Sequence, residues 1–173
     1  AVTQERDQWH EVELGLTRAG EIVGLRDAFV HDCGAFVSWG IIVPLITSVS
    51  VPGPYRVPHY EVTLTALYTN RVPVTPVRGA GRPQAVFVME RMLDLAAERL
   101  GLDRVAIRAR NLIQPGEFPY DVGLVSRDGG PRRYDSGNYP ECRRRLVAAV
   151  GWDGFAAEQQ RARAEGRSIG LGL

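Results

Sequence analysis

The sequence predicts an α/β (α+β) fold in which strands pack against one long helix. Apolar and polar residues alternate along residues 11–16 and again along residues 60–68, which is the period of a strand with one buried face. Between residues 86 and 100, apolar residues recur at spacings of three and four, the period of a helix with one buried stripe. The chain has 173 residues, of which 45% are hydrophobic and 24% are charged. It can therefore bury a sizeable core, as one domain or as parts of two.

The N-terminal region predicts a β-hairpin. Val12, Leu14 and Leu16 alternate with polar residues or glycine, so one face of this strand is expected to be buried. A turn at residues 18–20 follows, and residues 22–30 form the second expected strand.

The middle of the chain predicts a short helix and a further strand. Residues 34–50 combine small and aromatic residues with an apolar run that Pro44 interrupts, and we expect a short buried helix there. The Val-Pro-Gly-Pro sequence at 51–54 predicts a turn or loop. Residues 60–68 are rich in β-branched and aromatic residues and give the clearest strand pattern in the chain.

Terminal signals delimit the helices that follow. Pro83 suits the first helical position, because its fixed φ fits a helix and its missing N–H is not needed there, and Gly101 is a suitable C-terminal stop. Asp103 can cap a second helix over residues 105–112. Residues 114–138 are rich in Gly, Pro, Asp and Ser and predict a long loop, which is usually functional or a domain boundary. Two more helices are expected at about 140–149 and 153–165.

Charge and hydropathy exclude several classes of function. The net charge is +1, and all 21 basic residues are arginine, so no overall field attracts nucleic acid or an anionic membrane. The longest apolar run, residues 40–47, is too short for a membrane span and contains Pro44. The two cysteines, Cys33 and Cys142, form neither a disulfide framework nor a metal motif, so a reducing cytoplasm is expected.

The sequence Arg-Gly-Ala-Gly-Arg at residues 78–82 stands directly before the long helix and is typical of an anion site. The first N–H groups of a helix lack internal partners, glycines let a ligand approach the backbone, and an arginine adds charged donors. A phosphate, pterin oxygens or an oxyanion on a metal would fit. Alternatively, the glycines are ordinary turn residues and Arg78 pairs with a buried carboxylate. The spacing matches neither a Walker A loop nor a dinucleotide-binding fingerprint.

Six segments together resemble one enzyme family. They are VHDCGAF at 30–36, PGPYRVPHYE at 52–61, TNRVPVTPVRGAGRPQAVFVMER at 69–91, RARNLIQP at 108–115, FPYDVG at 118–123 and YDSGNYP at 134–140. The chain resembles the molybdopterin-binding large subunit of the molybdenum hydroxylases, the xanthine dehydrogenase/aldehyde oxidase family, and most of all its carbon monoxide dehydrogenase large subunit-like branch. The resemblance covers nearly the whole chain.

The resemblance implies a cofactor site and a set of partners. Arg78 would lie beside the molybdenum and the pterin, with Val77, Gly79, Ala80 and Gly81 as backbone contacts. The implied cofactor is molybdenum-molybdopterin in its cytosine dinucleotide form. The implied partners are an iron–sulfur small subunit with [2Fe-2S] clusters and a medium subunit that binds FAD. No catalytic residue and no protein ligand of a metal is implied within this chain.

The implied function is hydroxylation of an aldehyde or N-heterocycle, with water as the oxygen source, by an oxidoreductase of which this chain is part. Gly79 stands where carbon monoxide dehydrogenases have a copper-binding cysteine, which disfavours a copper–molybdenum site. Ala80 stands where xanthine dehydrogenases have a phenylalanine that stacks on the purine, which disfavours a purine. The family's glutamate general base does not occur among these residues, so we expect the chain alone to be inactive.

The resemblance also divides the chain. Residues 1–122 would be the C-terminal part of a first molybdopterin-binding domain and residues 123–173 the start of a second, so the chain would be an internal fragment. The alternative that stays open is a truncated, non-catalytic relative that acts as an interaction module. His31 and Asp32 are expected to be structural, because adjacent strand residues face opposite sides. His10 and His59 have no partners at metal-ligand spacing.

We expect that the isolated chain does not fold stably, because its ends interrupt strands and would expose apolar edges. Differential scanning calorimetry of the isolated chain should then show no cooperative unfolding transition. A single cooperative heat-absorption peak would contradict this expectation.

Overall fold

The computed structural model describes residues 7–37, 39–126 and 128–172. The elements of the first part of the chain are β1 (Gln8–Leu16), β2 (Ile22–Asp32), α1 (Ile42–Ser50), β3 (Tyr60–Leu67), α2 (Arg82–Leu100) and α3 (Arg104–Asn111). They are followed by the 3-10 helix η1 (Pro115–Glu117), β4 (Tyr120–Val125), β5 (Pro131–Tyr134), α4 (Tyr139–Ala149) and α5 (Trp152–Ala164).

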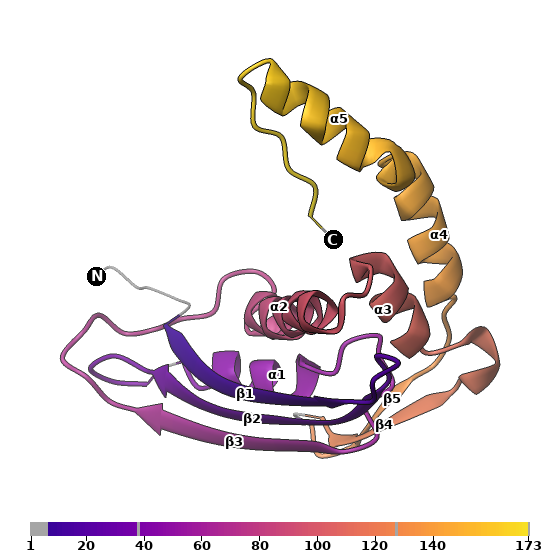
Figure 1. The fold of residues 1–173 in the computed structure, drawn as a ribbon. Helices are drawn as coiled ribbons and strands as arrows, with labels where there is room; N and C mark the ends of the chain where they lie inside the picture. Colours follow the sequence, from indigo (N-terminus) through magenta and orange to yellow (C-terminus); the bar gives the residue numbers. More distant parts are fainter. Residues whose placement is uncertain (1–6, 38, 127, 173) are drawn as a thin grey trace.

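A three-stranded mixed sheet with helices on one face forms the body of the protein (Figure 1). The strand order is β1-β2-β3; β1 pairs antiparallel with β2, so the expected hairpin is confirmed. β2 pairs parallel with β3, and α1 lies in the crossover between them. Alternate residues of β1 and of most of β2 and β3 are more deeply buried, and this face is covered by α1 and α2. The expected α/β fold is confirmed.

The core lies between the sheet and α2. Met89, Leu93 and Ala97 on the predicted apolar stripe are at most 2% exposed, and they belong to one cluster with Ile22 and Leu25 of β2. Burial of each large apolar side chain in this cluster stabilises the fold by roughly 1.5–3 kcal/mol. The helix begins one residue before the predicted start and ends as predicted, because the next residue, glycine, adopts a left-handed φ of 65°.

A buried arginine joins α3 to α2. The Arg108 Nε atom donates to the Glu90 carboxylate at 2.7 Å, and its Nη2 atom lies 3.0 Å from the Asp94 carboxylate. The side chain of Arg108 is 7% exposed, so these charged contacts are largely desolvated. Asp103 caps α3 as expected, since its side chain accepts a hydrogen bond from the Ala106 backbone.

A buried asparagine at the end of α3 holds the β1–β2 turn. The Asn111 side-chain oxygen accepts a hydrogen bond from the Ile22 backbone at 2.9 Å, and its amide nitrogen donates to the Gly20 carbonyl at 2.8 Å. Asn111 is about ninety residues from these groups in sequence, so its side chain joins the end of α3 to the start of β2 and the turn before it.

The expectation of a long loop at 114–138 was wrong. The region contains η1 and a hairpin of β4 and β5, in which Tyr120 stacks on Tyr134. The alternation of Tyr120, Val122 and Leu124 was a strand signal, but Gly123 adopts a φ of 74° and interrupts the ladder. The proposed domain division between residues 122 and 123 falls inside β4 and stays a prediction.

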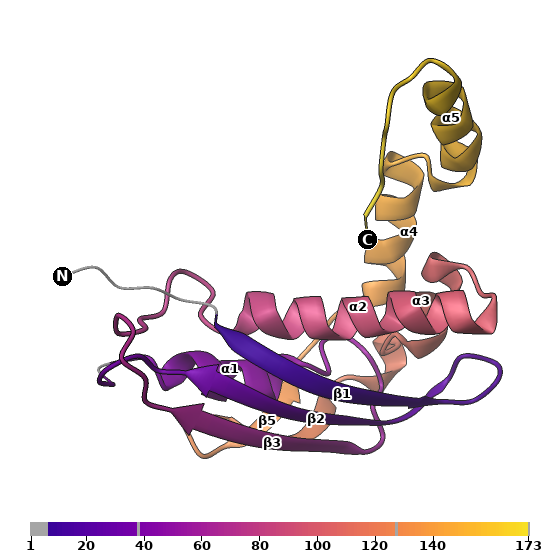
Figure 2. The ribbon, with the colours of Figure 1, turned by 60° about the vertical axis from the view of Figure 1, so that its left-hand side comes forward.

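Helices α4 and α5 form an arm that extends away from the body (Figures 1 and 2). Both were predicted within one residue of their bounds. Within these two helices, Ala162 is the only described residue that is buried. No helix in the described part of the chain is both long enough and apolar enough to cross a bilayer.

Replacement of Asn111 by leucine should destabilise the intact gene product. The change keeps the side chain's approximate volume but leaves the Ile22 N–H and the Gly20 carbonyl buried without a partner. Each unpaired group costs about 1–3 kcal/mol, so a lower thermal unfolding temperature is expected by circular dichroism. Asn70→Leu, at an exposed position, is the control. Equal unfolding temperatures for the two variants would contradict the role of Asn111.

Candidate functional site

Two overlapping turns lead into α2 and carry the Arg-Gly-Ala-Gly sequence. The Ala80 backbone donates to the Val77 carbonyl at 2.9 Å, and the Arg82 backbone donates to the Gly79 carbonyl at 3.1 Å. Gly79 has a φ of 99°, which favours glycine, and Ala80 has a φ of 48°. A left-handed alanine costs roughly 1–2 kcal/mol. Such strain persists where the surroundings hold the backbone in place, and it is concentrated at functional sites.

Gly81 is fixed by packing against α1. A Cβ atom at this position would lie 2.1 Å from the Val43 carbonyl oxygen and 2.4 Å from both the backbone nitrogen and the hydroxyl of Thr47. The φ of Gly81 is −75°, which any residue can adopt. The second glycine of the motif is therefore required by close contact between the turn and α1, a role that the sequence did not indicate.

Several hydrogen-bond donors of the turn have no acceptor among the residues that the structure describes. Within the described residues, the backbone N–H groups of Arg78, Gly79 and Gly81 have no acceptor. The Arg78 side chain is exposed, and it makes neither an ion pair nor a hydrogen bond with any described residue. The alternative that Arg78 pairs with a buried carboxylate therefore finds no support. The first N–H of α2 donates to Gly79 and Pro83 has none, while the Gln84 N–H also has no acceptor among the described residues.

A glutamine beside the turn is also unpaired. Both polar atoms of the Gln84 side chain are buried without a partner among the described residues. Gln84 lines a hollow of about 490 Å³ together with Gln8, Trp9, His10, Pro83, Phe87 and Val88. Arg78, Gly79 and Gly81 do not line this hollow. A guanidinium and backbone amides, as the turn carries them, are donors that suit an anionic ligand rich in oxygen, such as a pterin with its phosphate.

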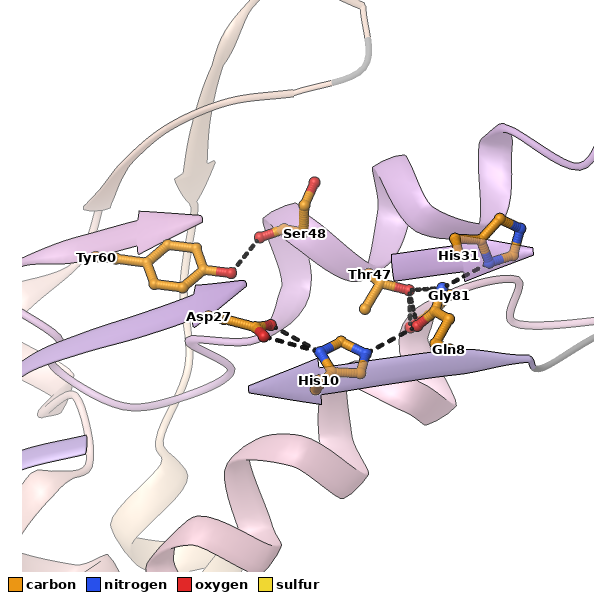
Figure 3. A network of polar contacts seen from close by, with 8 residues as sticks. All are labelled: Gln8, His10, Asp27, His31, Thr47, Ser48, Tyr60 and Gly81. Atoms are coloured by element: carbon orange, nitrogen blue, oxygen red, sulfur yellow. Dashed lines mark hydrogen bonds and ion pairs between the residues drawn. The ribbon is translucent and has the colours of Figure 1, made fainter. Parts of the chain in front are cut away.

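A network of buried polar side chains connects the sheet to the turn (Figure 3). The His10 Nδ1 atom lies 2.9 Å from the Asp27 carboxylate, and its Nε2 atom lies 3.1 Å from the Gln8 side-chain oxygen. The Gln8 amide donates to the Thr47 hydroxyl at 3.1 Å, and that hydroxyl donates to the Gly81 carbonyl at 3.2 Å. The path thus runs from a carboxylate on β2 to the last residue before α2.

The strand register brings these residues to one face. Gln8 pairs with His31 and His10 pairs with Phe29, while Asp27 lies two residues before Phe29 on the same face of the sheet. His10 also stacks on the Phe29 ring at a centroid distance of 4.5 Å. The sequence could not reveal this network, because its members are 17, 34 and 39 residues apart.

His31 and Asp32 face opposite sides of the sheet, as expected. Asp32 accepts hydrogen bonds from the Gly34 backbone and the Thr69 hydroxyl, both at 2.7 Å. His31 is fully buried, and its Nε2 atom has no hydrogen-bond partner among the described residues. Desolvation lowers the pKa of His31 below its ordinary value of 6.5, although the charge of Asp32 acts in the opposite direction.

Comparison with known families gives a match over most of the chain. The molybdopterin cofactor-binding domain family matches residues 1–112. The gamma subunit of the 6-hydroxypseudooxynicotine dehydrogenase complex of Paenarthrobacter nicotinovorans is 35% identical over 100% of the chain and 22% of its own length. The carbon monoxide dehydrogenase large chain of Hydrogenophaga pseudoflava is 33% identical over 97% of the chain and 21% of its own length.

A solved structure shares the fold. The crystal structure of quinoline 2-oxidoreductase from Pseudomonas putida 86 superimposes with a TM-score of 0.82 and 29% identity, over 95% of this chain and 20% of that one. The chain thus spans about a fifth of the length of these relatives. Within the described residues, no group of three or more His, Cys, Asp or Glu side chains is placed to hold a metal ion.

The buried His31 should make the intact gene product sensitive to acid. The pKa of His31 is lower in the folded than in the unfolded state. Below about pH 6.5 the unfolded state therefore binds more protons, and the free energy of unfolding decreases as the pH is lowered. We expect His31→Asn to reduce the fall in unfolding temperature between about pH 7.5 and about pH 5.5. His59→Asn, at an exposed histidine, should leave this fall unchanged. The same pH dependence in His31→Asn as in the parent protein would contradict the prediction.

Proposed function

The chain belongs to the molybdopterin-binding domain family of xanthine dehydrogenase and carbon monoxide dehydrogenase large subunits, and we propose that it forms one wall of the cofactor site in a molybdenum hydroxylase-type oxidoreductase. The observation that carries this proposal is the turn before α2, where the backbone amides of Arg78, Gly79 and Gly81 and the Arg78 guanidinium have no hydrogen-bond partner among the described residues. Because the chain spans about a fifth of its relatives' length, other segments of the intact gene product would complete the site.

Arg78 is the proposed charged contact of the cofactor. Its guanidinium offers planar, paired donors to anionic oxygens. The amides of Gly79 and Gly81 would bind further oxygens, while Val77 and Ala80 complete the backbone around them. The left-handed φ values of Gly79 and Ala80 preorganise the turn, so little conformational entropy is lost when the cofactor binds. When bound, the molybdenum group supplies the redox and hydroxylating chemistry.

The proposed substrate is an aldehyde or an aromatic N-heterocycle. Gly79 and Ala80 carry no large or metal-binding side chain at the turn, which leaves room beside the cofactor. One of the matched structures is an oxidoreductase named for quinoline, an aromatic N-heterocycle. The function of this chain's own residues would be to hold the cofactor and to limit the space beside it.

The proposed assembly is a multi-subunit complex in the cytoplasm. The matched relatives are named as a complex subunit and as a large chain, each one component of an assembly. We propose that the cofactor is the cytosine dinucleotide form, and that electrons leave through [2Fe-2S] clusters on an iron–sulfur small subunit to FAD on a medium subunit.

The experiment that tests this proposal measures the molybdenum and pterin content of the purified intact gene product. The parent protein should contain both, and Arg78→Ala should retain them roughly 10- to 150-fold less tightly, the range for one hydrogen bond to a charged group. Arg91→Ala removes an exposed arginine further along α2, nine residues after its first residue, and serves as the control. A parent protein without molybdenum and pterin would overturn the proposed function. Unchanged retention in Arg78→Ala would overturn the role of Arg78.

A further inference from the structure

Thr47 lies at the contact between α1 and the turn that precedes α2. Its side chain is fully buried, and its hydroxyl lies 3.2 Å from the Gly81 carbonyl, 3.0 Å from the Val43 carbonyl and 3.1 Å from the Gln8 amide nitrogen. A hydroxyl has one proton, so the Val43 and Gly81 carbonyls share it as acceptors, while the Gln8 amide donates to the hydroxyl oxygen. The threonine therefore ties three elements together at one atom.

The Gly81 carbonyl held by Thr47 is also the start of the α2 hydrogen-bond ladder. It accepts the backbone N–H of Ala85 at 3.1 Å, the first such bond of the helix. Among the described residues, the N–H of Gly81 itself has no acceptor, although the residue is buried. A displacement of Gly81 would thus move both the helix start and the donors of the turn.

The sheet anchors Thr47 through the other members of the network. Gln8 joins the Thr47 hydroxyl to His10, which lies against the fully buried Asp27 carboxylate at 2.9 Å. A buried carboxylate is costly unless it is paired, so the His10–Asp27 contact holds this end of the network in one place. Side chains in such a network restrain one another's rotamers.

We propose that Thr47 is a positioning residue for the cofactor, which sets the orientation of the Arg78–Gly81 turn through the Gly81 carbonyl. The inference rests on the proposed function and adds to it a residue that lies on a different helix from the turn. Thr47 does not contact the cofactor in this account. It acts through the backbone, supported by Gln8, His10 and Asp27.

The test compares three variants of the intact gene product. Thr47→Val keeps the side-chain shape and removes the hydroxyl, whereas Thr47→Ser keeps the hydroxyl. Ser48→Ala is the matched control, because the Ser48 hydroxyl is also buried on α1 but donates to the Leu45 carbonyl of its own helix at 2.9 Å. Each protein is assayed for molybdenum content, thermal unfolding temperature and the electron paramagnetic resonance spectrum of the molybdenum centre.

Thr47→Val should retain molybdenum about two- to tenfold less tightly than the parent, the effect of one neutral hydrogen bond, with an altered spectrum of the metal that remains. Thr47→Ser should restore both readings, and Ser48→Ala should leave both unchanged. If Thr47→Val fails to accumulate, Gln8→Met, which removes the partly exposed link from Thr47 to His10, should lower the molybdenum content in its place.

Two outcomes would overturn the positioning role of Thr47. One is a molybdenum content and spectrum in Thr47→Val that equal those of the parent protein. If Thr47→Val does not accumulate, parental values in Gln8→Met would overturn the role instead. The other is equal molybdenum loss in Thr47→Val and Ser48→Ala, in step with their unfolding temperatures, since this would indicate general destabilisation. A parent protein that contains no molybdenum would overturn the proposed function itself and is thereby distinguished from both.

Discussion

The contact between Gly81 and α1 is the constraint on which the rest of the site depends. Only a residue without a side chain can lie against the Val43 carbonyl and the Thr47 backbone, because any Cβ atom would overlap them. This contact fixes where α2 begins, and the start of α2 fixes the turn that carries Arg78. The donors of the turn therefore have a defined position although they make no hydrogen bond to any described residue.

Polar side chains of the sheet stabilise the contact between Gly81 and α1. Its register places Gln8, His10 and Asp27 on the face that α1 and α2 cover, and these polar groups satisfy one another instead of facing the apolar core. Elsewhere in the body, Asn111 holds the β1–β2 hairpin to α3, and Arg108 holds α3 to α2. The long helix is thus fixed at its start by a polar network and near its middle by the ion pairs of Arg108 with Glu90 and Asp94.

The sequence predicted those strands and helix ends whose signals lie within a few neighbouring residues. The alternation in β1 and β3, the stripe on α2, and the terminal signals at Asp103 and Gly101 act within a few residues, so their patterns can be recognised without the fold. The hairpin of β4 and β5 was missed, because Gly123 interrupts its ladder and the region has the composition of a loop. The network around Thr47 and the packing role of Gly81 depend on contacts between distant residues, for which a single sequence carries no signal. Arg78 was predicted to be a cofactor contact from its place before a helix and from the resemblance; the structure leaves its side chain exposed, and its role stays a prediction.

The most direct test of the central claim is an experimental structure of the intact gene product with its cofactor bound. The account predicts that the Arg78 guanidinium and the amides of Gly79 and Gly81 lie within hydrogen-bond distance of oxygen atoms of the cofactor. It also predicts that Gly81 remains in contact with α1. A cofactor bound elsewhere, with the turn covered by another segment of protein that takes up these donors, would contradict the account.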